Sequence, residues 1–187
     1  HDAIFTGEVY DARLELGSWN REGYDDSAWE PALAVRPPTG VLQAQTIPFT
    51  KVMGTVDTYC EQANDSLYIF TLPETVSGWC ELSVKGRAGD SVKLRFISDE
   101  GLNYGQEDVY ILKGGQEERW EPKFTWHAFK KIEVIATEGV AISGQSIQVK
   151  SIYTDIRNTG SFECSNELFN NICEAYDRTM HANFKGI

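Results

Sequence analysis

The chain has 187 residues, 41% of them hydrophobic, which is enough to bury a core without disulfide or metal cross-links. Its 17 basic and 28 acidic residues give a formal net charge of −11, and in the absence of a Lys/Arg-rich run this charge disfavours nucleic acid as a partner. No apolar stretch approaches the ~20 residues of a membrane-spanning helix, so we expect a soluble chain with no membrane span.

The opening stretch, HDAIFTGEVYDARLEL, enters a strand-like pattern almost at once and has no initiating Met, which suggests a piece of a longer protein. The compartment is therefore left open. We expect residues 1–40 to form the end of an N-terminal β-module and a linker. The stretch EPALAVRPPTGVLQAQTIPFTKV carries most of the prolines and no sustained alternation, so it is expected to cross between two modules in extended form.

Two tryptophans, Trp19 and Trp29, flank an acidic pair in the stretch GSWNREGYDDSAWEPA. Gly23, Asp25, Asp26 and Ser27 favour a turn with Asx-type hydrogen bonds, with the tryptophans packing the ends of the module. The alternative is that one indole is a platform on which a sugar ring stacks. Adjacent carboxylates on a strand point apart, so this pair does not suit a role that needs facing acids.

Residues 41–158 show an apolar period of two, which indicates half-buried strands. In WCELSVKG the residues Cys80, Leu82 and Val84 share one face, and in SVKLRF the inward set is Val92, Leu94 and Phe96. The intervening GRAGD predicts a hairpin between these two strands. With SLYIFTL, DVYILKG, WEPKFTW, KKIEVIA and SIQVKSIYT the count reaches about seven strands, which favours a mainly β fold, an antiparallel two-sheet sandwich of the jelly-roll type.

The pattern changes to that of an amphipathic helix after residue 160. Apolar residues recur every four positions, and Ser165 is placed to cap the N-terminus. We expect this stripe to pack on the sandwich or on a neighbouring chain, since a helix of ~15 residues is marginal alone in water. The stripe consists of Leu168, Ile172, Tyr176 and Met180. Residues 159–187 are thus predicted to start a helical domain.

The ordered set GEVYDAR, DDSAW, PTGVLQAQ, DVYILKGG, EPKFTWHAF and YTDIRNTGSFECSNELFN resembles the bacterial α-L-rhamnosidases of glycoside hydrolase family 78. The resemblance implies the end of an N-terminal β-domain, a concanavalin-like sandwich, and the first helix of an (α/α)6 catalytic barrel. It also implies that the catalytic acids lie outside this sequence. One departure is the stretch FTLPETVSGW, where such sandwiches typically read Phe-Gly-Gln-Asn before the Gly-Trp pair.

Candidate sugar contacts are Trp19, Trp29, Trp79 and His127, although a strand histidine is more often only hydrogen-bonded within the fold. The acid pairs Asp99–Glu100 and Glu107–Asp108 lie beside turns and are expected to be solvated. The histidines are too scattered in sequence to propose a metal site. No catalytic residue, metal or cofactor is therefore predicted.

Three functions follow from the resemblance and the residues. The first, which we favour, is a non-catalytic scaffold of an α-L-rhamnosidase that removes terminal α-L-rhamnose, with the catalytic domain of the same polypeptide as partner. The second is a carbohydrate-binding module for rhamnose-containing glycans. A self-sufficient glycosidase would need two facing carboxylates at ~5 Å or ~6.5–9.5 Å, and the sequence offers no such pair.

Overall fold

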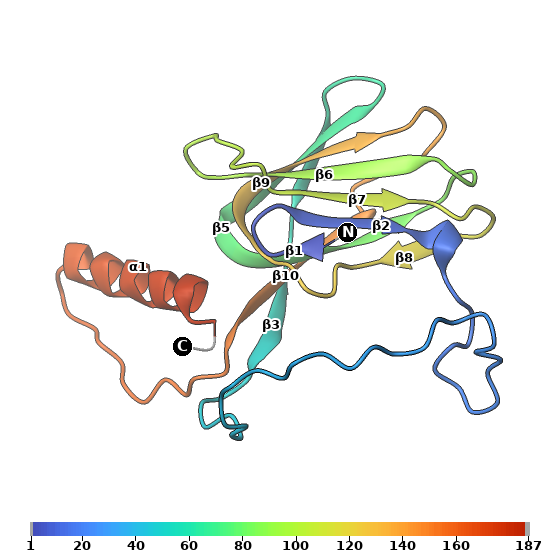
Figure 1. The fold of residues 1–187 in the computed structure, drawn as a ribbon. Helices are drawn as coiled ribbons and strands as arrows, with labels where there is room; N and C mark the ends of the chain where they lie inside the picture. Colours follow the sequence, from blue (N-terminus) through green and yellow to red (C-terminus); the bar gives the residue numbers. More distant parts are fainter. Residues whose placement is uncertain (1, 186–187) are drawn as a thin grey trace.

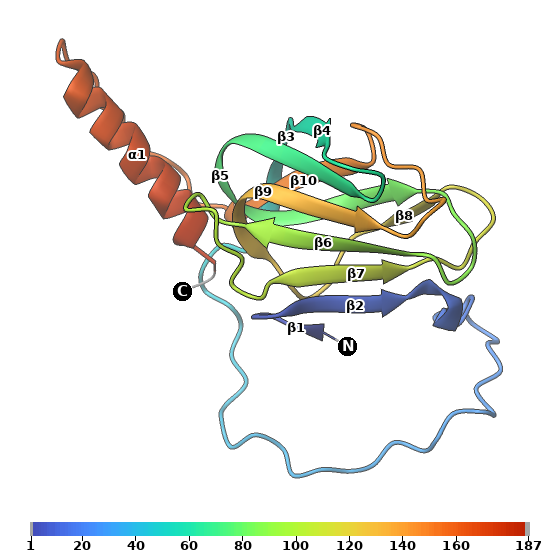
Figure 2. The ribbon, with the colours of Figure 1, turned by 90° about the horizontal axis from the view of Figure 1, so that it is seen from above.

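A computed structural model describes residues 2–185. Figures 1 and 2 show a β-sandwich with one helix beyond its end and a long extended segment outside it. The elements in chain order are β1 (Asp2–Ala3), β2 (Gly7–Asp11), the 3-10 helix η1 (Ala12–Leu14), β3 (Thr50–Val56), β4 (Tyr59–Gln62), β5 (Leu67–Val84), β6 (Ser91–Ile97), β7 (Glu107–Ile111), β8 (Glu118–Trp120), β9 (His127–Ala136), β10 (Ile147–Thr154) and α1 (Glu167–Asn183). The predicted mainly β fold with a C-terminal helix is confirmed.

The described strands form one ten-stranded sheet, and not the two separate sheets predicted; the sheet curls into two layers that share the long strand β5. The first half of β5 lies between β4 and β9, and the layer continues through β6, β7 and β2 to β1. The second half of β5 lies between β8 and β10, and β3 closes that layer. All pairings given for the described strands are antiparallel except β2 with β7, which is parallel.

A bulge between Thr71 and Val76 lets β5 pass from one layer to the other. At Gly78 the strand has a register partner on each side, His127 in β9 and Ser151 in β10. A Cβ atom at Gly78 would overlap the carbonyl oxygen of Lys150, so only glycine allows β10 to come this close.

The core lies between the layers and follows the predicted alternation. The expected inward residues of β5 and β6 are buried, and Leu82, Val92 and Leu94 have no exposed surface. Phe70 and Phe129 are also fully enclosed. The inward faces of these strands are therefore confirmed.

The predicted hairpin between residues 79–85 and 91–96 is wrong. β6 pairs with β7 and β9, whereas the second half of β5 pairs with β8 and β10. The loop between them connects the two layers, with Gly89 N–H donating to the Leu112 carbonyl at 2.9 Å. The strand expected over residues 120–126 is also displaced, since β8 ends at Trp120.

Candidate functional site at the helix–sandwich junction

The stretch around Trp19 and Trp29 forms the expected turn. The carboxylate of Asp25 accepts the Ser27 N–H at 3.0 Å, and hydrogen bonding to Ser27 lowers the pKa of Asp25. The two indoles do not pack the module ends, because they are 57% and 48% exposed. They contact each other, with ring centroids 6.4 Å apart, and Tyr24 lies 5.8 Å from Trp29. Their binding of sugar stays a prediction.

Trp79 lies on the half-buried outer face of β5, in a polar network. Its indole N–H donates to Glu121 at 2.8 Å. The ammonium group of Lys150 lies 2.7 Å from both Glu81 and Glu121. Burial opposes ionisation of Glu121, but the hydrogen bonds from Lys150 and Trp79 leave its pKa below the ordinary value. The network fixes the orientation of the Trp79 ring.

His127 is fully buried at the start of β9. Its Nε2 lies 3.1 Å from both carboxylate oxygens of Asp108, and its ring stacks on Phe96 at 3.9 Å. Asp108 also has no exposed surface, so the expectation that it is solvated is wrong. The reason is that Asp108 shares the inward face of β7 with Tyr110, while Glu107 is half-buried on the other face. Thus Trp19 and Trp29 lie together on a loop, Trp79 lies on the outer face of β5, and His127 is enclosed in the core.

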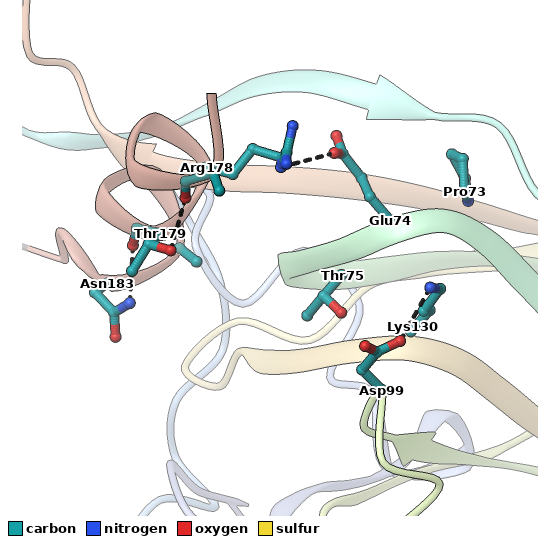
Figure 3. A pocket seen from close by; sticks show the side chains of 10 residues that line it. Pro73, Glu74, Thr75, Asp99, Lys130, Arg178, Thr179 and Asn183 are labelled. Carbon is teal, nitrogen blue, oxygen red and sulfur yellow. Dashed lines mark hydrogen bonds and ion pairs between the residues drawn. The ribbon is translucent and has the colours of Figure 1, made fainter. Parts of the chain in front are cut away.

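The helix meets the bend of β5 around a cavity of about 600 Å³, drawn in Figure 3. Pro73, Glu74 and Thr75, the residues that depart from the family pattern, line it from the sandwich side. Glu74 lies 3.7 Å from Arg178 of α1, and Asp99 lies 3.0 Å from Lys130. The departure therefore lies where the sandwich faces the helix, and no local pattern in either stretch predicts this contact.

The C-terminal end of α1 is attached to β10. The rings of Tyr153 and His181 stack with centroids 4.2 Å apart. The carbonyl of Phe184 accepts both the N–H and the hydroxyl of Thr154, at 2.9 and 3.0 Å. Lys185 donates to the Ile152 carbonyl, and its Nζ lies 5.5 Å from the centre of the Trp126 ring. Burial lowers the pKa of Lys185 to about 8.

The apolar stripe of α1 is largely open. Leu168, Ile172 and Tyr176 are 62%, 53% and 63% exposed, and only Met180 is partly buried. Of the two partners expected for the stripe, the sandwich is wrong, because only the end of the helix reaches the sheet. Packing on a neighbouring chain stays a prediction. The N-cap is also Asn166 and not Ser165, since the Asn166 side chain accepts the Leu168 N–H at 3.0 Å.

The described residues contain no group of three or more His, Cys, Asp or Glu side chains that could hold a metal ion. Within the same part of the chain, no helix has the length and apolar character needed to span a bilayer.

These features define a β-sandwich that carries an adjoining helix. Two family models match it: the α-L-rhamnosidase N-terminal domain over residues 1–54 and the bacterial α-L-rhamnosidase concanavalin-like domain over residues 61–153. The chain therefore belongs to the bacterial α-L-rhamnosidase family, glycoside hydrolase family 78, as the resemblance predicted.

Individual relatives agree with this assignment. An α-L-rhamnosidase of Formosa agariphila is 32% identical over 98% of this chain, which spans 21% of that relative. The solved α-L-rhamnosidase from Dictyoglumus thermophilum is 28% identical to this chain, with a TM-score of 0.90. The match covers 98% of this chain and 22% of the chain of that structure. The solved α-L-rhamnosidase of Streptomyces avermitilis, complexed with L-rhamnose, is 27% identical to this chain, with a TM-score of 0.84. The match covers all of this chain and 19% of the chain of that structure. The chain thus spans about a fifth of these relatives.

Proposed function

We propose that this chain is a non-catalytic scaffold of a longer α-L-rhamnosidase and positions a helical catalytic domain that removes terminal α-L-rhamnose. In this proposal residues 1–40 end an N-terminal β-module and its linker, residues 41–158 form the concanavalin-like sandwich, and residues 159–187 begin the (α/α)6 domain. The observation that carries the proposal is that α1 is fixed at one end and leaves its apolar stripe open.

The free energy of burial supports a helical partner for that stripe. Covering a leucine or isoleucine side chain contributes about 1.5–3 kcal/mol, and a lone helix of this length is only marginally stable in water. Ile172 and Tyr176 lie four residues apart on one face, as in a helix that packs on other helices. The fixed end at Tyr153 and Thr154 then sets the direction in which such a domain leaves the sandwich.

Glu81 and Glu121 are one pair of neighbouring carboxylates that a catalytic role could involve. Both carboxylates lie 2.7 Å from the ammonium of Lys150, so they are close to one another. A glycosidase general acid needs a raised pKa, whereas the pKa of Glu121 is lowered. Lys150 also occupies the space between the two acids. We infer that this pair organises the sheet surface and does no chemistry.

Hydrolysis of an aryl α-L-rhamnoside tests the proposal. The chain alone is expected to give no turnover above buffer, and a longer protein that contains it is expected to be active. Glu81→Gln in the longer protein should keep most of that activity. Turnover by the chain alone that disappears in Glu81→Gln would refute the scaffold role.

A second candidate function is carbohydrate binding, which the half-exposed indoles of Trp19 and Trp29 favour. Indole faces pack well on sugar rings, and these two lie together on one loop. Trp79 and His127 complete the set of candidate contacts, although His127 presents no exposed surface. Calorimetric titration with L-rhamnose distinguishes the candidates, because a pure scaffold gives no heat of binding.

A further inference from the structure

A second groove lies away from the helix junction, where the end of β2 meets β8 and the second half of β5. It has a volume of about 450 Å³, within the usual range of small-ligand sites. Tyr10 and Trp120 line it, together with charged residues from three separate segments. Neither of these aromatic residues was singled out by the sequence.

The aromatic residues of this groove pack on one another. Trp120 stacks on Tyr110 with centroids 5.4 Å apart, and Tyr10 lies 6.0 Å from Tyr110 and 6.2 Å from Trp120. The Tyr10 hydroxyl donates to Glu15 at 3.1 Å, which fixes its edge. Trp120 is only 7% exposed, whereas Tyr10 is half-buried and lines the groove. An apolar ligand face can therefore contact Tyr10 without rearrangement of these residues.

The charged side chains of the groove are nearly balanced. Three carboxylates, those of Glu15, Glu81 and Glu121, line it beside two cations, Arg119 and Lys123. The ammonium of Lys150 pairs with Glu81 and Glu121 and that of Lys113 pairs with Glu15 at 2.6 Å, so each of the three carboxylates has a cationic partner. A phosphate would meet three carboxylates and a cationic ligand would meet two cations. Hydroxyl groups suit both kinds of side chain, because each hydroxyl donates and accepts.

We propose that this groove binds one neutral sugar residue, with its apolar face on Tyr10 and its hydroxyls on Glu81, Glu121 and Arg119. The proposal rests on the carbohydrate-binding candidate and not on the scaffold role. It places the site near Trp79, whose indole shares Glu121 with the groove. The cavity at the helix junction is lined by acidic and basic side chains but by no aromatic ring on which a sugar could stack.

Nuclear magnetic resonance of the five tryptophan indole N–H groups tests the site on the intact chain. L-rhamnose and D-galactose are titrated separately, and the signals are assigned with single Trp→Phe variants. The expected result is that at least one sugar shifts the Trp79 and Trp120 signals with a common midpoint. Arg119→Ala and Glu81→Gln should each raise the sugar concentration at the midpoint by about tenfold, the usual loss of affinity for a hydrogen bond to a charged group.

The matched control is Lys131→Ala, which removes an exposed cation of β9 outside the groove and should leave the midpoint unchanged. Absence of any shift at Trp79 and Trp120 up to the solubility of both sugars would overturn the site. Shifts confined to Trp19 and Trp29 would move carbohydrate binding to the exposed loop and also overturn it. None of these outcomes affects the scaffold role, which is judged by rhamnoside hydrolysis.

Discussion

Asp108 and His127 face each other in the core, with Nε2 of the imidazole 3.1 Å from both carboxylate oxygens and neither residue exposed. Asp108 also accepts the Glu8 N–H at 2.9 Å, so one carboxylate joins β2, β7 and β9. Asp108→Ala leaves both donors buried without an acceptor and should lower the free energy of unfolding by roughly 2–5 kcal/mol. Urea denaturation measures the loss.

The control for this prediction is Asp99→Ala. The Asp99 side chain is 64% exposed and pairs with Lys130, so its loss should cost less than about 1 kcal/mol. Equal losses in the two variants would show that the Asp108 carboxylate does not organise the three strands.

Glu8 should make the free energy of unfolding depend on pH. It is 5% exposed, and burial is the main cause that raises its pKa. A carboxyl group with a raised pKa in the folded state contributes stability below the unfolded pKa and loses it as pH rises through the folded pKa. Glu8→Gln should therefore gain stability relative to the parent chain as pH rises from about 4 to 7. Urea midpoints for both proteins at each pH give this difference, and a difference that does not change with pH contradicts the prediction.

Because the apolar stripe of α1 is open, we expect this chain to tolerate polar substitutions in the stripe. Ile172 is 53% exposed, so Ile172→Asp should change the free energy of unfolding by less than about 1 kcal/mol. The fully buried Phe129 is the contrast, and Phe129→Ala should cost about 3–5 kcal/mol. In a longer protein with the helical domain, Ile172→Asp should instead lower the melting temperature markedly. Similar melting temperatures there for variant and parent would argue against a covered stripe.

Trp29→Ala should have a modest effect. Because the indole is 48% exposed and contacts only Trp19 and Tyr24 among aromatic rings of the described residues, we expect a loss of about 1 kcal/mol. The sharp fall in melting temperature expected for a buried tryptophan should not occur. Thermal unfolding followed by circular dichroism measures this, and a fall as large as that of Phe129→Ala would mean that the loop packs on the sandwich.

Local patterns predicted where the strands lie and which faces they bury, but not which strands pair with one another. The alternation around Leu82 and Leu94 identifies the inward faces because burial depends on a period of two within each strand. It does not reveal that these strands lie in different layers, since pairing depends on β8, β9 and β10 far along the chain. A turn motif such as GRAGD is compatible with either a hairpin or a connection between layers.

The site residues were harder to predict for a similar reason. Glu74 and Arg178 are joined by folding, and nothing local in either stretch signals the contact. Asp108 has a usable signal, since it alternates with Tyr110, but a charged residue beside a turn is usually solvated. The apolar period of α1 correctly predicted a helix. The period itself could not show which surface covers the apolar stripe of that helix.

The passage of β5 through both layers has a consequence for how the chain unfolds. Because one strand of 18 residues supplies hydrogen-bond partners to each layer, neither layer can lose its strand register while the other keeps it. The sandwich should therefore melt in one cooperative step, with the calorimetric and van't Hoff enthalpies equal. The attached helix, held by its last turn, should fray at lower temperature without disturbing that transition.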